Sequence, residues 1–425
     1  METTKIKSTA PDKPVDLVAR IFVILLGLLP VIAVYAPKGM VLLVGTAAVA
    51  LLFDQGVRKD LRATPLPPIL VVSLPLIVWS LIAVNWSPSP AKALRLWGSI
   101  MLLLAAARIL NAGVAQISDS DRHRMKSALI LSAGLFIVLV GIENITEGFI
   151  VKILKGTRGK GIDDYKAWLA PGNTIMAVCA WPMIGAVASR TNIYVGATMF
   201  AAITILTVFG FSDAAVLAMV VSGLVLALVL WGKRWALAGI AALSFVGAVA
   251  TPFLIQAIRW SGIREIFGVK SSFPVTPSHR WVIWKFTSSR IMDHPFRGWG
   301  FNSSRSIPGS SGHAYGQQYA EMLPLHPHNG SLQIWLELGL VGALAFALII
   351  AAAPYQARRI SNNWRETAIL MGVVAAYMTL GQLSFGVWQN WWIATMILAI
   401  TLARLSVGTE AIKPDHTNTA SLYHG

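Results

Sequence analysis

Apolar runs long enough to cross a bilayer recur along most of the chain, and they constrain the fold more than any other feature. A helix needs about 20 apolar residues to span the hydrocarbon core, because each residue adds about 1.5 Å. The sequence therefore predicts an all-α polytopic membrane protein with about twelve transmembrane helices. The runs lie at 17–35, 38–54, 67–85, 93–111, 126–143, 172–189, 192–210, 213–231, 234–253, 331–354, 366–383 and 387–405.

The composition excludes an ordinary soluble domain. Of the 425 residues, 55% are hydrophobic and only 13% are charged, and the mean hydropathy is +0.63. The chain holds 35 basic and 19 acidic residues, a surplus that would suggest nucleic-acid binding in a soluble protein. In a membrane protein such a surplus is first explained by basic cytoplasmic loops. We therefore expect no nucleic-acid partner.

Alternate connections between the apolar runs are basic, and this pattern places both chain ends in the cytoplasm. The first run lacks a convincing cleavage site, so we expect a retained helix rather than a signal peptide. The resulting division is a cytoplasmic tail at 1–16, helices 1–9 at 17–253 with a basic periplasmic loop at 144–171, a periplasmic lobe at 254–330, helices 10–12 at 331–405, and a polar, disordered cytoplasmic tail at 406–425.

The connection at 254–330 is far longer than usual, which points to function or disorder. Its many aromatic residues argue against disorder, so we predict a large, partly helical periplasmic lobe between helices 9 and 10. Within it, RWVIWKFTSSRIM at 280–292 is expected to form an amphipathic helix whose tryptophans could lie at the membrane interface.

The predicted lobe carries basic residues on the outer side, where the positive-inside pattern does not explain them. They either meet lipid headgroups or bind an anionic ligand, and we favour a phosphate site because the arginine fork matches phosphate oxygens. The loop at 152–166 is also basic and contains TRGKG, although its spacing is not that of a nucleotide-binding loop. The lobe holds Arg259, Arg264, Arg280, Arg290, Arg297 and Arg305, with His279, His294, His313, His326 and His328, against only Glu265, Asp293 and Glu321.

The stretch LPLHPHNGSLQIWLELGL at 323–340 places two histidines directly before an apolar helix. His326 and His328 could join His313 in a zinc site, but no HExxH motif occurs and acids are few, so we expect no metal site and no cofactor. A neutral histidine acting as general base fits better, because nearby arginines would keep it deprotonated. Glu337 is expected at membrane depth, paired with a loop arginine.

Three motifs resemble the O-antigen ligase and polymerase superfamily. HPHNGSLQIWLELGLVGAL at 326–344 resembles its histidine–asparagine pair followed by a Glu-Leu-Gly helix. RWVIWKFTSSRIMDHPFRGWGFNSS at 280–304 is similar to its arginine, tryptophan and His-Pro-x-x-Gly-x-Gly order, and TRGKG followed by PGN gives a looser match. At the start of the eighth helix, many members show a Ser-Arg-like pair where this chain has Ser212–Asp213.

The resemblance implies a membrane glycosyltransferase of GT-C-like architecture in the bacterial inner membrane, with its active site on the periplasmic side. It implies metal-independent, inverting transfer of a glycan from an undecaprenyl-pyrophosphate-linked donor to a lipid A-core acceptor. By position, His328 would be the base, and Arg280 and Arg158 would stabilise the leaving pyrophosphate. The predicted substrate-binding residues are Arg158, Arg290, Arg297, His326, Asn329, Lys160 and Asn173.

Other functions remain open at this stage. A polymerase would join two lipid-linked repeats, and its typical motif of arginine, ten residues and glycine occurs once, from Arg305 to Gly316. A flippase or transporter of lipid-linked glycans would place ionisable residues along the helices, whereas here they concentrate in the outer loops. A scaffold or sensor for anionic lipid would bind membrane lipids without transfer.

Overall fold

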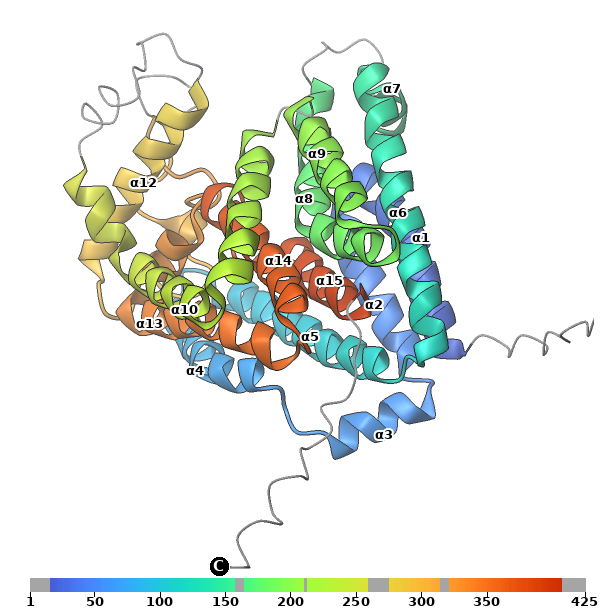
Figure 1. Cartoon of the computed structure of the whole chain (residues 1–425). Helices are drawn as coiled ribbons and strands as arrows, with labels where there is room; N and C mark the ends of the chain where they lie inside the picture. The colour runs from blue at the N-terminus through green and yellow to red at the C-terminus, as the bar shows by residue number, and fades with distance from the viewer. Residues whose placement is uncertain (1–15, 157–163, 210–211, 259–274, 314–320, 407–425) are drawn as a thin grey trace, which may run out of the picture.

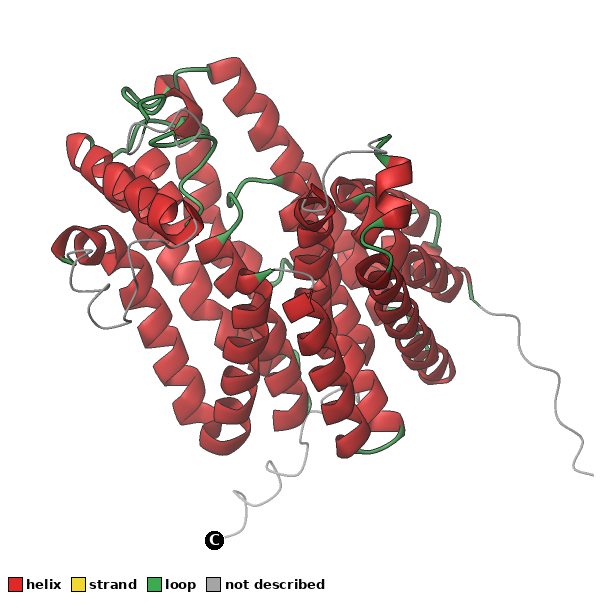
Figure 2. Cartoon of the chain, turned by 90° about the horizontal axis from the view of Figure 1, so that it is seen from above, coloured by secondary structure: helices red, strands yellow, loops and turns green. Residues whose placement is uncertain are grey.

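The computed structural model describes residues 16–156, 164–209, 212–258, 275–313 and 321–406. Throughout these ranges the chain is built from α-helices, short 3-10 turns and loops, and the described residues form no strand beyond one isolated bridge between His313 and Glu321. Figure 2 shows the helices packed side by side, with the longer loops gathered toward one end. The all-α polytopic fold is confirmed.

Most of the apolar runs coincide with one helix each. The structure contains α1 (Leu17–Tyr35), α2 (Met40–Leu51), α3 (Gln55–Ala63), α4 (Pro68–Ile82), α5 (Pro90–Ala115), α6 (Asp119–Ile145), α7 (Phe149–Leu154), α8 (Asp164–Arg190), α9 (Ile193–Phe209), α10 (Asp213–Ala257), α12 (Val275–Asp293), α13 (Gly330–Arg359), α14 (Trp364–Leu383) and α15 (Asn390–Ser406), with 3-10 turns η1 (Pro37–Gly39), η2 (Ala83–Trp86) and η3 (Ser304–Ser306).

The number of spans differs from the expected twelve. Among the described residues, eight helices have at least 18 residues and are apolar enough to cross a membrane, and the pair Pro37–Leu51 and Gln55–Ala63, bent by 94°, would make nine. Two expected spans share α10, whose 45 residues change direction at Lys233. The expected spans at 192–210 and 387–405 form helices of 17 residues, one short of this length.

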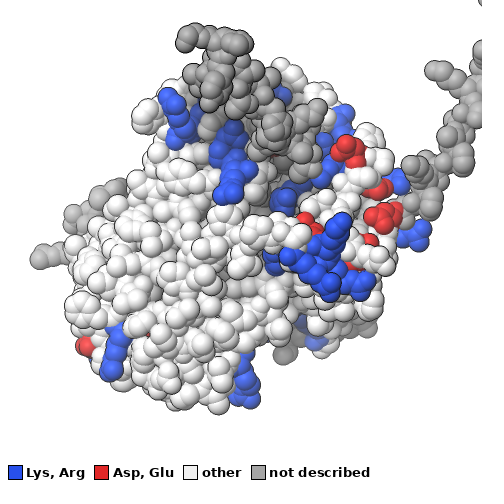
Figure 3. All heavy atoms as spheres, turned by 90° about the horizontal axis from the view of Figure 1, so that it is seen from below, with Lys and Arg blue, Asp and Glu red and all other residues white. Residues whose placement is uncertain are grey.

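The surface of the helix bundle suits contact with lipid. Leu102, Leu131 and Leu243 have 74%, 73% and 75% of their side chains exposed, although they lie in the middle of long apolar helices. On the face drawn in Figure 3, lysine and arginine side chains form a few separate clusters, and most of the remaining surface carries no charge. A surface this apolar would be unstable in water but is stable in hydrocarbon.

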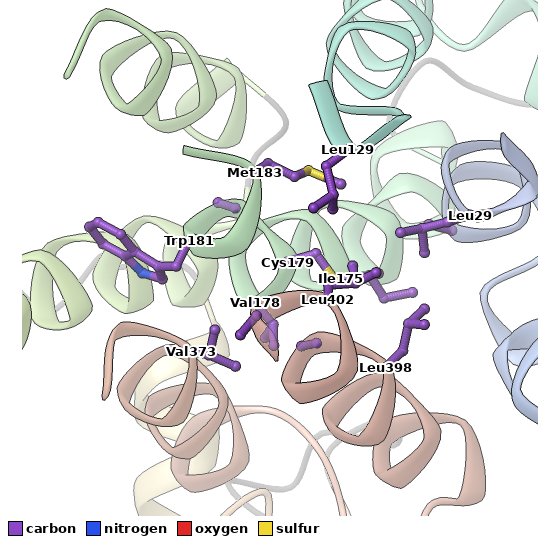
Figure 4. Close-up of a cluster of buried hydrophobic side chains, with 14 of the residues drawn as sticks. Leu29, Leu129, Ile175, Val178, Cys179, Trp181, Met183, Val373, Leu398 and Leu402 are labelled. Carbon is purple, nitrogen blue, oxygen red and sulfur yellow. The ribbon is translucent and has the colours of Figure 1, made fainter. Parts of the chain in front are cut away.

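The main core forms around α8, in which 83% of the most apolar stretch is buried. Ile175, Val178 and Cys179 point from α8 toward Leu398 and neighbouring side chains (Figure 4). Cys179 is fully buried and free, as expected of a packed thiol within an apolar run.

The predicted helix at 280–292 is confirmed as part of α12, which packs against α10 and α13 on the side of the molecule away from α1 and α6 (Figure 1). Its buried face includes Ile283, Phe286 and Ile291. Both tryptophans of this helix pack against protein, and their expected place at the membrane interface stays a prediction. Trp281 is only 8% exposed, and the indole N–H of Trp284 donates to the carbonyl of Pro327 at 3.0 Å.

α13 is interrupted at Gly339, and the loop at 295–302 fills the interruption. Backbone amides of Trp299 and Gly300 donate to the carbonyls of Leu336 and Glu337, both at 2.9 Å. In return, the amide of Leu340 donates to the carbonyl of Pro295 at 2.8 Å. The backbone groups freed by the break are therefore satisfied by the loop, as buried amides and carbonyls require.

Two glycines allow this close approach. Gly298 and Gly339 have φ values of +71° and +65°, and a Cβ at Gly298 would lie 2.4 Å from the carbonyl carbon of Glu337. A Cβ at Gly339 would lie 2.3 Å from the carbonyl oxygen of Phe296. Neither overlap can be relieved by moving a flexible side chain, because the clashing atoms belong to the backbone.

We predict that Gly298→Ala destabilises the protein by about 2 kcal/mol or more, through left-handed strain plus backbone overlap. The measurement is the thermal unfolding midpoint of the purified protein in detergent. Gly247→Ala in α10 is the matched control, because nothing lies within 4 Å of its added Cβ. Equal unfolding midpoints for the two variants would contradict the insertion of the 295–302 loop into the break of α13.

Candidate active site

The turn from His326 to Asn329 leads from the lobe into α13. Asn329 caps the helix, because its Oδ1 accepts the amide hydrogen of Leu332 at 2.9 Å. The turn places His328 at φ +53°, a left-handed conformation that is uncommon for any residue with a side chain. Such strain persists only where surrounding contacts hold it, and it is concentrated at functional sites.

Contacts from two distant segments hold this turn. The Nδ1 of His328 lies 2.7 Å from the carbonyl oxygen of Ser384, in the connection between α14 and α15. Trp284 of α12 donates to Pro327, one residue before His328. Since a carbonyl only accepts, the Nδ1 of a neutral His328 carries the proton, and Nε2 keeps its lone pair.

The surroundings of His328 favour its neutral form. Burial lowers the pKa of His328 below the usual 6.5, the bond to Ser384 opposes this, and the positive charges of Arg280 and His279 lower the pKa further. Arg280 is itself partly buried, which lowers its pKa, while Asp213 at the start of α10 raises it. Because the ordinary pKa of arginine lies far above neutral pH, Arg280 remains a cation beside a neutral imidazole.

His326 has the contacts of a structural residue. It is only 6% exposed, and its Nδ1 accepts the amide hydrogen of His328 at 3.2 Å. Its Nε2 lies 3.2 Å from the side-chain amide nitrogen of Gln389. Rotating the Gln389 side-chain amide by a half turn exchanges its oxygen and nitrogen, so that the Nε2–H of His326 would donate to the Gln389 oxygen. That oxygen is otherwise buried without a partner. Burial, with the charges of His328 and Arg305, lowers the pKa of His326 to about 3.

Glu337 anchors the polar network beneath this turn. Its carboxylate is fully buried and accepts hydrogen bonds from four donors. The expected pairing with an arginine is wrong, because all four donors are uncharged and come from three separate segments. They are the amide of Asn302, the hydroxyl of Ser304, the side-chain amide of Gln333 and the indole of Trp388.

The remaining predicted site residues are spread over the structure. Arg290 lies near the end of α12, where it pairs with Asp293 at 3.3 Å and stacks on Phe286. Arg297 is exposed and lies over the ring of Trp86. Asn173 is buried in α8. The predicted roles of Arg158 and Lys160 fall at 157–163, which lies outside the described residues.

Sequence reasoning missed the segment at 384–389, which contributes Ser384, Trp388 and Gln389 to the site. SFGVWQN looked like a short loop of low charge. No pattern in these residues indicated a place in the site; only the structure shows that Gly386 allows the close approach, because a Cβ there would lie 3.0 Å from the ring of His326. Arg305 acts on His326, a role that its place in the basic lobe did not indicate.

Within the described ranges, no three histidine, cysteine, aspartate or glutamate side chains lie close enough together to form a metal site. His313 is joined to Glu321 by backbone pairing. His326 and His328 have ring centroids 4.3 Å apart, but their described hydrogen bonds go to protein atoms.

The fold and site define a polytopic membrane protein in which a neutral histidine lies beside an arginine at one end of the helix bundle. Residues 197–347 match the family model described as O-antigen ligase. This segment runs from α9 into α13 and includes Arg280 and the His326–Asn329 turn. Over these residues the chain is similar to the O-antigen ligase family.

Similar proteins come from several Rickettsia species and carry the name "Putative polysaccharide ligase". The Rickettsia conorii protein is 28% identical over 299 residues, covering 69% of each chain. The Rickettsia felis protein is 26% identical over 341 residues, covering 79% of each chain. The Rickettsia bellii protein is 28% identical over 298 residues, covering 69% of each chain.

We predict that Glu337→Gln lowers the unfolding free energy by about 2–4 kcal/mol, because an amide NH₂ would face buried donors that now meet a carboxylate. The unfolding midpoint in detergent measures the change. Asp293→Asn is the control, since its pair with Arg290 is exposed and worth less than about 1 kcal/mol. If Glu337→Gln were as mild as Asp293→Asn, the carboxylate would not anchor the network.

Proposed function

We propose that this protein transfers O-antigen glycan from undecaprenyl pyrophosphate to a lipid A-core sugar on the periplasmic face of the bacterial inner membrane. The single observation that carries the proposal is the state of His328, a neutral imidazole in a strained turn held by two other segments, with an unprotonated Nε2 to which no described residue donates a hydrogen bond. A group prepared in this way suits a general base. The family supports ligation of a glycan in general, and the donor, acceptor and residue roles are our inference.

The proposed step is an inverting displacement. The acceptor hydroxyl oxygen bonds to the anomeric carbon of the donor glycan while the bond from that carbon to the pyrophosphate oxygen breaks. The Nε2 of His328 takes the hydroxyl proton, and the pyrophosphate leaves with the electron pair and its negative charge. Because Nδ1–H already donates to Ser384, that carbonyl also stabilises the imidazolium that forms.

Arg280 is placed to stabilise the leaving group. Its cation acts on His328, and it lies on α12, which is locked to the turn through Trp284 and Pro327. A guanidinium can bind two phosphate oxygens at once, and its effect grows as charge develops on the pyrophosphate. Arg290 and Arg297 extend the basic surface from the same helix and the loop after it, where they could hold further phosphate or acceptor oxygens.

We predict that His328→Ala lowers the transfer rate by about 10²–10⁴-fold, the usual contribution of a positioned base. Arg280→Lys should lower it by roughly 10²-fold or more, because a point charge cannot replace the fork. The assay uses purified protein, lipid-linked glycan and lipid A-core, with EDTA present. Lys285→Gln on the same helix is the control and should retain activity.

Each alternative outcome of this assay has a defined meaning. If product formed only between two lipid-linked repeats, the protein would be a polymerase and the proposed ligase function would be wrong. Full activity of His328→Ala would remove the proposed base, and loss of transfer in EDTA would contradict the metal-independent step. Translocation of lipid-linked glycan into the opposite leaflet of a vesicle, without transfer, would support a flippase.

We predict that transfer is independent of pH above about 6.5 and declines below it, because the base acts when deprotonated and its pKa is lowered. The rate should halve at a pH below 6.5. In Arg280→Gln the residual activity should decline at a higher pH, since the charge that lowers the pKa of His328 is lost. A wild-type midpoint at or above pH 7 would contradict a depressed histidine pKa.

A further inference from the structure

A large apolar cavity of about 1150 Å³ lies among α8, α9, α10 and α14, and the proposed reaction does not use it. Its volume exceeds the roughly 300–1,000 Å³ of a typical small-molecule site. Its lining includes residues at the start of α14, whereas Ser384, directly after the end of α14, contacts His328 at 2.7 Å. Because α14 joins these points through 20 residues, or about 30 Å of helix, the cavity and the candidate active site lie at opposite ends of the bundle.

The interior of the cavity is shaped for flexible hydrocarbon. Trp181 and Phe200 form one wall, with ring centroids 5.3 Å apart. The indole of Trp181 is fixed by its hydrogen bond to Ser222 at 2.8 Å. Gly196 and Gly223 line the space without side chains of their own. These residues leave a smooth apolar volume with few groups that could orient a polar ligand.

The charged residues that line the cavity are mainly basic. They are Lys126 on α6 and Arg365 on α14, together with one acid, Glu366, and we call the part of the cavity that they line its mouth. The Glu366 carboxylate accepts the amide hydrogen of Asn362 at 2.7 Å, just before α14 begins. Nearby, the guanidinium of Arg190 contacts Ser127 and His123 on α6. These connectors belong to the basic set that the positive-inside rule assigns to the cytoplasm, where the membrane surface carries anionic lipid.

We propose that this cavity binds one anionic phospholipid of the cytoplasmic leaflet. The acyl chains lie along Trp181 and Phe200, and the headgroup phosphate meets Lys126 and Arg365. The combination of an apolar interior with a cationic mouth matches both parts of such a lipid. The prenyl chain of the proposed donor is a poorer occupant, because its pyrophosphate would then lie at the end of the bundle away from His328.

The test is native mass spectrometry of the full chain, washed free of lipid in detergent and titrated with phosphatidylglycerol or with phosphatidylcholine of the same acyl chains. We expect one phosphatidylglycerol per chain, bound about tenfold or more tightly than phosphatidylcholine. The double variant Lys126→Gln and Arg365→Gln should remove this preference. Arg58→Gln with Lys59→Gln, which removes equal charge from α3, should keep it.

A second variant tests the apolar part. Ala197 is an exposed residue on the cavity wall, so Ala197→Trp should fill the space and reduce binding of both lipids at least tenfold while the unfolding midpoint stays near that of the wild type. Equal affinity for the two lipids would overturn the proposal. So would unchanged binding in Ala197→Trp, or displacement of the lipid by glycerol 3-phosphate alone.

Discussion

The insertion of the loop at 295–302 into the break of α13 is the interaction on which the rest of the site depends. A helix interrupted inside a bilayer exposes amides and carbonyls that lipid cannot satisfy. Here the loop supplies the missing partners through Leu336, Glu337 and Leu340, and the indole of Trp79 donates to the Leu338 carbonyl at 2.8 Å. This exchange fixes the first turns of α13 relative to the lobe, and the histidine turn is attached directly to those turns.

The polar network above the break converts this backbone docking into a rigid site. Gln333 accepts the amide hydrogen of Val387 and donates to Glu337, both at 3.0 Å, so it joins the 384–389 segment to the buried carboxylate. That segment in turn presents the Ser384 carbonyl to His328 and the Gln389 amide to His326. Both ring nitrogens of His326 therefore have partners in this turn and segment, whereas among the described residues His328 is bonded through Nδ1 alone.

The sequence predicted the elements well because bilayer thickness dictates their length. The first run, at 17–35, coincides with α1, and the tenth, at 331–354, lies within α13. The number of spans was predicted less accurately, because it also depends on where the backbone bends. Two expected spans form the single helix α10, which is broken at Lys233. His328 and Arg280 were accessible from local motifs. The residues that contact these motifs could not be predicted from the sequence. Ser384 and His328, for example, are 56 residues apart, and no local pattern connects them.

The central claim is that the turn holds the His328 imidazole neutral, with the proton on Nδ1 and an unprotonated Nε2. The most direct measurement is nitrogen NMR of ¹⁵N-histidine-labelled protein in lipid bilayers, with the His328 signals assigned by comparison with His328→Gln. We predict a protonated Nδ1 and an unprotonated Nε2 at pH 7, with titration below pH 6.5. An imidazolium at pH 7, or the tautomer with the proton on Nε2, would contradict the account.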